Sequence, residues 1–123
     1  MQTTAGLSSG KGPHTDGGDG DDTLQGADGN DTLLAGEGNN TAFAGADADT
    51  VTASAGNDSI DAGAGDDLVL AGDDDNSIAG GEGGDTLFSG VGADSIDAGA
   101  GADGVSAGEG NDTVLGGDGD DTT

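Results

Sequence analysis

The chain has 123 residues, of which 29 are glycine and 26 are aspartate or glutamate, and its formal net charge is −25. Aromatic residues make up 2% and cysteine is absent, which excludes an ordinary packed globular core and a disulfide framework. The single basic side chain cannot neutralise phosphate, so nucleic acid and anionic membrane surfaces are excluded as partners. We expect one structured domain whose natural partners are cations.

Residues 1–16 differ in composition from the rest of the chain. This segment is polar, carries Lys11 and lacks the apolar stretch of a secretory signal peptide. No apolar run anywhere approaches the ~18 residues of a membrane-spanning helix. We therefore interpret residues 1–16 as a disordered polar leader and residues 17–123 as the structured domain. His14 is interpreted as part of the leader and not as a catalytic or metal-binding residue.

A nine-residue period runs through residues 17–123 without insertion or deletion, beginning GGDGDDTLQ, GADGNDTLL and AGEGNNTAF. Low hydrophobicity with high charge is also typical of intrinsic disorder. However, a disordered acidic chain has no reason to keep one register over such a length. The period therefore indicates a structure built from stacked repeats.

Glycine dominates the second and fourth positions of the repeat, and an apolar residue occupies the eighth. One apolar residue in nine is too sparse for a helix face, and glycine further disfavours a helix. We predict a turn over the first six residues, with glycine at positive φ, and then a three-residue strand whose middle side chain points inward. Two repeats then make one coil, and stacked coils form two facing parallel sheets. The predicted core positions are Leu24, Leu33, Ala42, Val51, Ile60, Val69, Ile78, Leu87, Ile96, Val105 and Val114.

These repeats resemble the RTX, or hemolysin-type calcium-binding, nonapeptides G-G-x-G-x-D-x-U-x, in which U is apolar. The resemblance extends over residues 17–123 and rests on many copies in phase. It implies an all-β, right-handed parallel β-roll, a β-helix or solenoid with two repeats per coil, that holds multiple Ca²⁺ ions between neighbouring turns. It also implies a secreted, extracellular bacterial protein region exported by type I secretion.

The sixth position of the repeat supplies the candidate metal ligands. Carboxylate and carbonyl oxygens suit Ca²⁺, which accepts irregular coordination by six to eight oxygens. Since such a site exists only when coils stack, calcium binding is expected to drive folding. The candidate ligands are Asp22, Asp31, Asn40, Asp49, Asp58, Asp67, Asn76, Asp85, Asp94, Asp103, Asp112 and Asp121.

Successive turns alternate between the two sides of the β-roll, so each turn stacks on the turn two repeats later. Asn40 and Asn76 both fall on one side, and the other side carries only aspartate at the sixth position. We therefore expect the all-aspartate side to bind calcium more tightly. Asp47 and Asp74 replace the glycine of the fourth position, so they either strain their turns or contribute an additional carboxylate.

No motif indicates an enzyme. Residues 99–104 match G-x-G-x-x-G but follow no crossover strand, and the regularly repeated carboxylates single out no catalytic acid.

We predict a calcium-binding region, with two alternatives for its parent: a spacer in an adhesin, or the C-terminal module of a type I-secreted toxin or hydrolase. A constitutively disordered acidic chain is the competing interpretation. The repeats end with polar Thr123 in a core position, so we expect the unpaired sheet edges there to favour end-to-end self-association or fraying.

Overall fold

The computed structural model describes residues 4–7 and 14–123, and all regular structure in this part of the chain is β. No helix there has the length and hydropathy needed to cross a membrane. The strands are β1 (Thr4–Leu7), β2 (His14–Asp16), β3 (Thr23–Asp28), β4 (Thr32–Gly36), β5 (Thr41–Ala46), β6 (Thr50–Ala53), β7 (Ser59–Ala64), β8 (Leu68–Leu70), β9 (Ser77–Glu82), β10 (Thr86–Phe88), β11 (Ser95–Ala100), β12 (Gly104–Ser106) and β13 (Thr113–Leu115).

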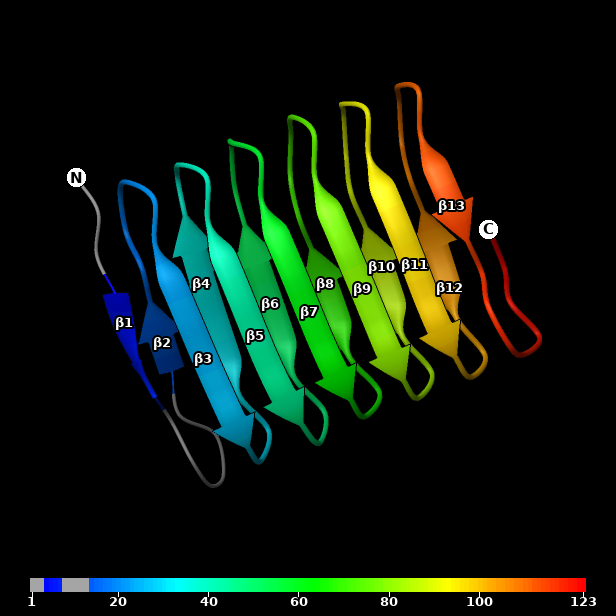
Figure 1. Cartoon of the computed structure of the whole chain (residues 1–123), viewed down its shortest axis with the longest axis horizontal. Helices are drawn as coiled ribbons and strands as arrows, with labels where there is room; N and C mark the ends of the chain where they lie inside the picture. The colour runs from blue at the N-terminus through cyan, green and yellow to red at the C-terminus, as the bar shows by residue number, and fades with distance from the viewer. Residues whose placement is uncertain (1–3, 8–13) are drawn as a thin grey trace.

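The strands alternate between two parallel sheets, so each coil contributes one strand to each sheet. The odd-numbered strands form one sheet in the order β1-β3-β5-β7-β9-β11-β13, and the even-numbered strands form the other in the order β12-β10-β8-β6-β4-β2. Figure 1 shows the two layers face to face, with the coils stacked along the long axis. Leu24 pairs with Ala42, and Leu33 pairs with Val51, so the register advances by two repeats per coil. The predicted parallel β-roll with two repeats per coil is confirmed.

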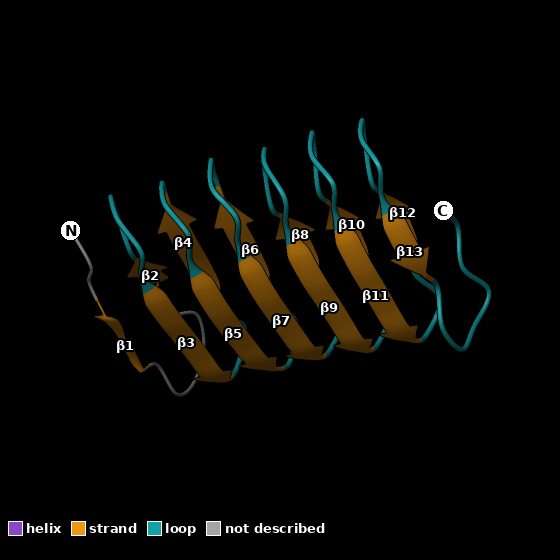
Figure 2. Ribbon diagram, turned by 45° about the horizontal axis from the view of Figure 1, so that its top comes forward, coloured by secondary structure: helices purple, strands orange, loops and turns teal. Residues whose placement is uncertain are grey.

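Five of the odd-numbered strands are longer than predicted. β3, β5, β7, β9 and β11 each have six residues, whereas β8, β10 and β12 have the three that the repeat pattern predicts. In the longer strands the pairing continues into the following turn, where Ala27 pairs with Gly45 and Asp28 pairs with Ala46. The prediction of a three-residue strand is therefore wrong for these five strands, and β4 and β6, with five and four residues, are also longer than predicted. The pairing of this sheet continues through the first three positions of the next repeat, although the second position has positive φ, as at Gly45. Figure 2 shows these strands as long arrows side by side.

The core between the sheets contains the predicted residues of the eighth position and a second, unpredicted set. From Leu24 to Val105, the eighth-position side chains are buried. Small side chains of the first position are buried beside them, namely Ala35, Ala44, Ala53, Ala62, Ala71, Ser89 and Ala98. In residues 17–123 the first position holds only glycine, alanine or serine. This restriction to small residues could have predicted from the sequence that the first position faces a narrow core.

Strands β1 and β2 extend the two sheets at their N-terminal end. Thr4 pairs with Thr23, and Thr15, which is buried, pairs with Leu33. Their pairing satisfies backbone groups of β3 and β4 that would otherwise form a sheet edge. Thr15 lies nine residues before Leu24 and thus at an eighth position, although the preceding second, fourth and sixth positions carry neither glycine nor aspartate. Lys11 lies outside the described residues.

Truncation of the core is expected to destabilise the β-roll far more than truncation of its outer face. Leu87 is fully buried in β10, whereas Leu70 in the neighbouring β8 is 37% exposed. We expect Leu87→Ala to lower the free energy of unfolding by about 2–5 kcal/mol and Leu70→Ala to lower it by less than about 1 kcal/mol. Urea denaturation in saturating calcium, followed by circular dichroism, measures both. Equal losses would contradict the assigned core.

Candidate metal centres at the turns

The sixth-position side chains stack in two columns where the turns join the two sheets. From Asn40 to Asp121, each accepts, through Oδ1, the backbone N–H of the sixth-position residue 18 positions earlier, at 2.7–3.1 Å. Thus the Asp31 N–H donates to Asp49 and the Asp49 N–H donates to Asp67, both at 2.7 Å. The predicted stacking of turns two repeats apart is present.

Two names distinguish these columns. The all-aspartate column contains Asp31, Asp49, Asp67, Asp85, Asp103 and Asp121. The mixed column contains Asp22, Asn40, Asp58, Asn76, Asp94 and Asp112. In Figure 1 the turns of the mixed column run along the upper side and those of the all-aspartate column along the lower side.

Stacking buries these side chains almost completely. The sixth-position residues from Asp22 to Asp103 are 1–3% exposed. Asp112 and Asp121 are only half-buried, because they belong to the last turn of each column. Burying an ionised carboxylate is costly unless a charge or hydrogen-bond donors compensate it.

The second carboxylate oxygen has no such compensation in the interior of either column. Oδ2 is buried and has no hydrogen-bond partner in Asp49, Asp58, Asp67, Asp85, Asp94 and Asp103. Buried polar atoms of folded proteins are nearly always hydrogen-bonded, so a deficit repeated in turn after turn needs a common cause. A cation or a proton at each Oδ2 would remove it.

The asparagine turns reveal which groups face this position. The side-chain amide Nδ2 of Asn40 donates to the carbonyl oxygens of Gly36 at 3.3 Å and of Gly38 at 3.1 Å. Gly36 and Gly38 have φ of 85° and 115°, in the region that favours glycine, and both carbonyl groups point inward to the amide. Because the register is continuous along the column, the carbonyl groups of the second and fourth positions face the corresponding atom in the aspartate turns.

An aspartate turn therefore presents one carboxylate oxygen among backbone carbonyl oxygens. In the described part of the chain no three aspartate, glutamate or histidine side chains converge to hold a metal ion, so the donor set depends on carbonyl groups. Hard oxygen donors in an irregular arrangement fit Ca²⁺ better than Mg²⁺, which demands a near-ideal octahedron. The oxygen donors of the site therefore fit Ca²⁺ as the ion that compensates the buried carboxylate charge.

Burial also changes the protonation of these carboxylates. It raises the pKa of Asp49 and of Asp58 to about 6 and the pKa of Asp67 to about 7, and it raises the pKa of Asp85 as well. The backbone N–H bonded to Oδ1 opposes the effect of burial on each pKa. When no cation is bound, these groups take up protons at higher pH than an exposed aspartate does.

Asp47 and Asp74 adopt the strained backbone conformation that their place in the repeat predicts. Their φ angles are 80° and 77°, in the left-handed region that favours glycine. Oδ2 of Asp47 accepts the backbone N–H of Gly29, and Oδ2 of Asp74 accepts that of Gly56, each at 3.2 Å. These carboxylates thus bond to the backbone of the preceding stacked turn, which partly offsets the strain.

The sequence matches a model of the RTX calcium-binding nonapeptide repeat (four copies) at residues 16–51, 43–78, 70–105, 79–114 and 97–122. The chain belongs to the RTX calcium-binding nonapeptide repeat family. Membership of the RTX family implies calcium binding. The comparison identifies only the RTX repeat module in this chain and no catalytic domain. Neither a curated protein nor a solved structure matches the RTX chain significantly.

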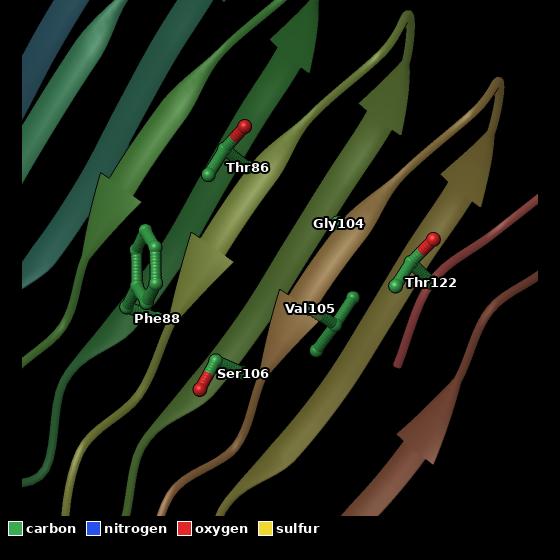
Figure 3. A pocket seen from close by; sticks show the side chains of 6 residues that line it. All are labelled: Thr86, Phe88, Gly104, Val105, Ser106 and Thr122. Carbon is green, nitrogen blue, oxygen red and sulfur yellow. The ribbon is translucent and has the colours of Figure 1, made fainter.

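A hollow of about 220 Å³ on the sheet of even-numbered strands lies apart from the turns. It is lined by Thr86, Phe88, Gly104, Val105, Ser106 and Thr122. Figure 3 shows Gly104 between the two flanking threonines, at the seventh position of its repeat. The seventh position elsewhere in residues 17–123 holds threonine, serine or leucine. The hollow is therefore the space of a missing side chain, and its lining contains no acid, base or imidazole.

Filling this hollow is expected to stabilise the RTX chain. A Cβ at Gly104 meets no atom closer than 3.9 Å, and threonine favours a strand, so Gly104→Thr should raise the free energy of unfolding by about 0.5–1 kcal/mol. Thermal denaturation in calcium measures this gain. As a matched control, Gly99→Thr should destabilise, because Gly99 has φ of 103° and a Cβ there would lie 2.9 Å from the carbonyl carbon of Gly81. A loss of stability in Gly104→Thr would show that the hollow is not the space of a missing side chain.

The raised carboxylate pKa values predict that acid partly substitutes for calcium. The folded state binds protons at higher pH than the unfolded chain, whose aspartate pKa is about 3.8, so acid favours folding. In buffer freed of calcium by a chelating resin, the β signal in circular dichroism should increase as the pH falls from about 7 to about 4. In calcium, the same protons compete with the ion, so calcium affinity should fall over this range. A calcium-free signal that decreases steadily with acid would refute the sign.

Proposed function

We propose that the RTX chain binds Ca²⁺ at its aspartate turns and folds on binding, as a region of a secreted bacterial protein. The observation that carries this proposal is the recurrence of a buried Oδ2 without a donor, seen from Asp49 to Asp103. A divalent cation at each of these atoms would neutralise the buried charge and bond to the surrounding carbonyl oxygens at once.

The balance of forces in the chain supports the coupling of binding to folding. The core receives few large apolar side chains, since each repeat contributes one residue at the eighth position and a small residue at the first. Ordering a glycine-rich backbone costs more conformational entropy than ordering an average chain. Carboxylates stacked in columns add repulsion at neutral pH. Because the ligands come together only when the turns stack, the binding free energy of calcium becomes folding free energy.

The all-aspartate column is proposed to bind calcium more tightly than the mixed column. Each interior turn of the all-aspartate column supplies a carboxylate, and each carboxylate bonds through Oδ1 to the backbone of the preceding turn. Two interior turns of the mixed column supply the neutral amide of Asn40 or Asn76 instead. A neutral ligand lowers the electrostatic attraction for a divalent cation.

The proposed setting is the outside of a bacterial cell, reached by type I secretion. Calcium sites of extracellular modules have dissociation constants of about 0.1–1 mM, so an RTX chain of that affinity stays unfolded in calcium-poor cytosol and folds after export. The RTX family supports this setting. The parent protein is proposed to be an adhesin, with this region as a spacer, or a toxin or hydrolase, with this region as its C-terminal module.

A calcium titration tests the proposed function. In excess chelator at pH 7.5 we expect the far-ultraviolet circular dichroism spectrum of a largely unfolded chain, and in millimolar calcium a β spectrum. Magnesium at the same concentration is the control and should produce little of the change, because the irregular carbonyl and carboxylate donors do not form its octahedron. Identical β spectra in chelator and in calcium would overturn the proposal.

A further inference from the structure

Asn40 and Asn76 replace aspartate in the mixed column without changing how the turns stack. Oδ1 of Asn40 accepts the backbone N–H of Asp22 at 2.8 Å, and Oδ1 of Asn76 accepts that of Asp58 at 3.0 Å. Both residues are 2% exposed, as are Asp22, Asp58 and Asp94 of the same column. The asparagine and aspartate side chains therefore take the same place and differ in one atom, which is Nδ2 in asparagine and Oδ2 in aspartate.

This atom reverses the hydrogen bonding of the turn. Nδ2 of Asn76 donates to the carbonyl oxygens of Gly72 at 3.3 Å, of Asp74 at 3.0 Å and of Ser89, in the next stacked turn, at 3.4 Å. Gly72 and Asp74 hold the same repeat positions as the two carbonyl acceptors of Asn40. In both turns the amide hydrogens thus satisfy the carbonyl oxygens that a cation would otherwise bind, whereas the Oδ2 of Asp58, between them in the column, has no donor.

We propose that the side-chain amides of Asn40 and Asn76 take the place of calcium in their turns, which close without an ion. This inference rests on the proposed calcium binding of the aspartate turns. A cation entering an asparagine turn would have to displace the amide and approach its partially positive hydrogens, and it would meet no carboxylate charge from that residue. The two closed turns separate Asp22, Asp58 and Asp94 along the mixed column, which reduces the repulsion between their buried charges.

Stoichiometry of bound calcium tests this inference directly. The double variant Asn40→Asp/Asn76→Asp restores an acceptor oxygen in both turns, so it should bind two more calcium ions per chain than the parent. Equilibrium dialysis against calcium, with the metal measured by atomic emission, counts the ions. Circular dichroism on the same samples establishes that both proteins are folded. The transition between unfolded and folded chain should also become steeper in calcium concentration, since more ions bind on folding.

The reverse substitution keeps the test decisive if the double variant does not fold. Asp58→Asn supplies an amide to a turn that otherwise takes an ion, so it should bind one ion fewer and still fold in calcium. Asp58→Ala is the matched control. It should also lose the ion, and it should be less stable than Asp58→Asn in saturating calcium, because alanine supplies neither the amide donor nor the Oδ1 acceptor for the Asn40 N–H.

The outcomes separate this inference from the proposed function. A parent chain that binds no calcium overturns the proposed function and, with it, the inference. If the parent binds calcium and the folded double variant gains no ion, or if Asp58→Asn loses none, calcium binds the asparagine turns as it binds the others. Such a result would overturn the inference and leave the proposed function standing. Equal instability of Asp58→Asn and Asp58→Ala would also overturn it.

Discussion

The side chain at the sixth position of the repeat joins neighbouring turns through one atom and leaves the other in a buried position surrounded by acceptors. Oδ1 bonds to the backbone N–H of the preceding stacked turn throughout both columns. The second atom lies out of reach of water, where an ionised oxygen needs a positive partner. The same side chain thus joins the stacked turns through Oδ1 and, when it is an ionised aspartate, requires a positive partner at Oδ2.

The other regular features of the turn follow from this arrangement. The carbonyl groups of the second and fourth positions reach the second atom from a backbone of positive φ, as at Gly36 and Gly38. Glycine at the fourth position also allows close stacking, since a Cβ at Gly38 would lie 2.6 Å from the carbonyl carbon of Gly20. An outer ladder, which the repeat pattern alone does not predict, reinforces the stacking at the fifth position, where the Asn39 N–H donates to Asp21 Oδ1 and the Asn57 N–H donates to Asn39 Oδ1, both at 2.8 Å.

The electrostatics of the two columns differ, because two buried sixth-position residues of the mixed column are neutral. Along the all-aspartate column, burial and neighbouring carboxylates together raise the pKa of Asp67 to about 7, which measures how unfavourable the unneutralised charge is. In the mixed column, Asn40 and Asn76 add no charge, and their amides satisfy their surroundings with hydrogen bonds. One β-roll thus combines turns that need a positive charge with turns that do not.

The sequence by itself determined the repeat, the apolar eighth position, the coil of two repeats and the sixth-position side chains that stack. These properties repeat with a fixed period, and in a solenoid each repeat contacts the same neighbours, so position in the repeat predicts position in space. Only the tertiary structure decided the six-residue strands, the pairing of Thr15 in β2, and the opposite hydrogen bonding of Asn40 and Asp58. These features depend on which backbone and carbonyl groups the stacked coils bring within about 3 Å of one another, and no single repeat contains that information.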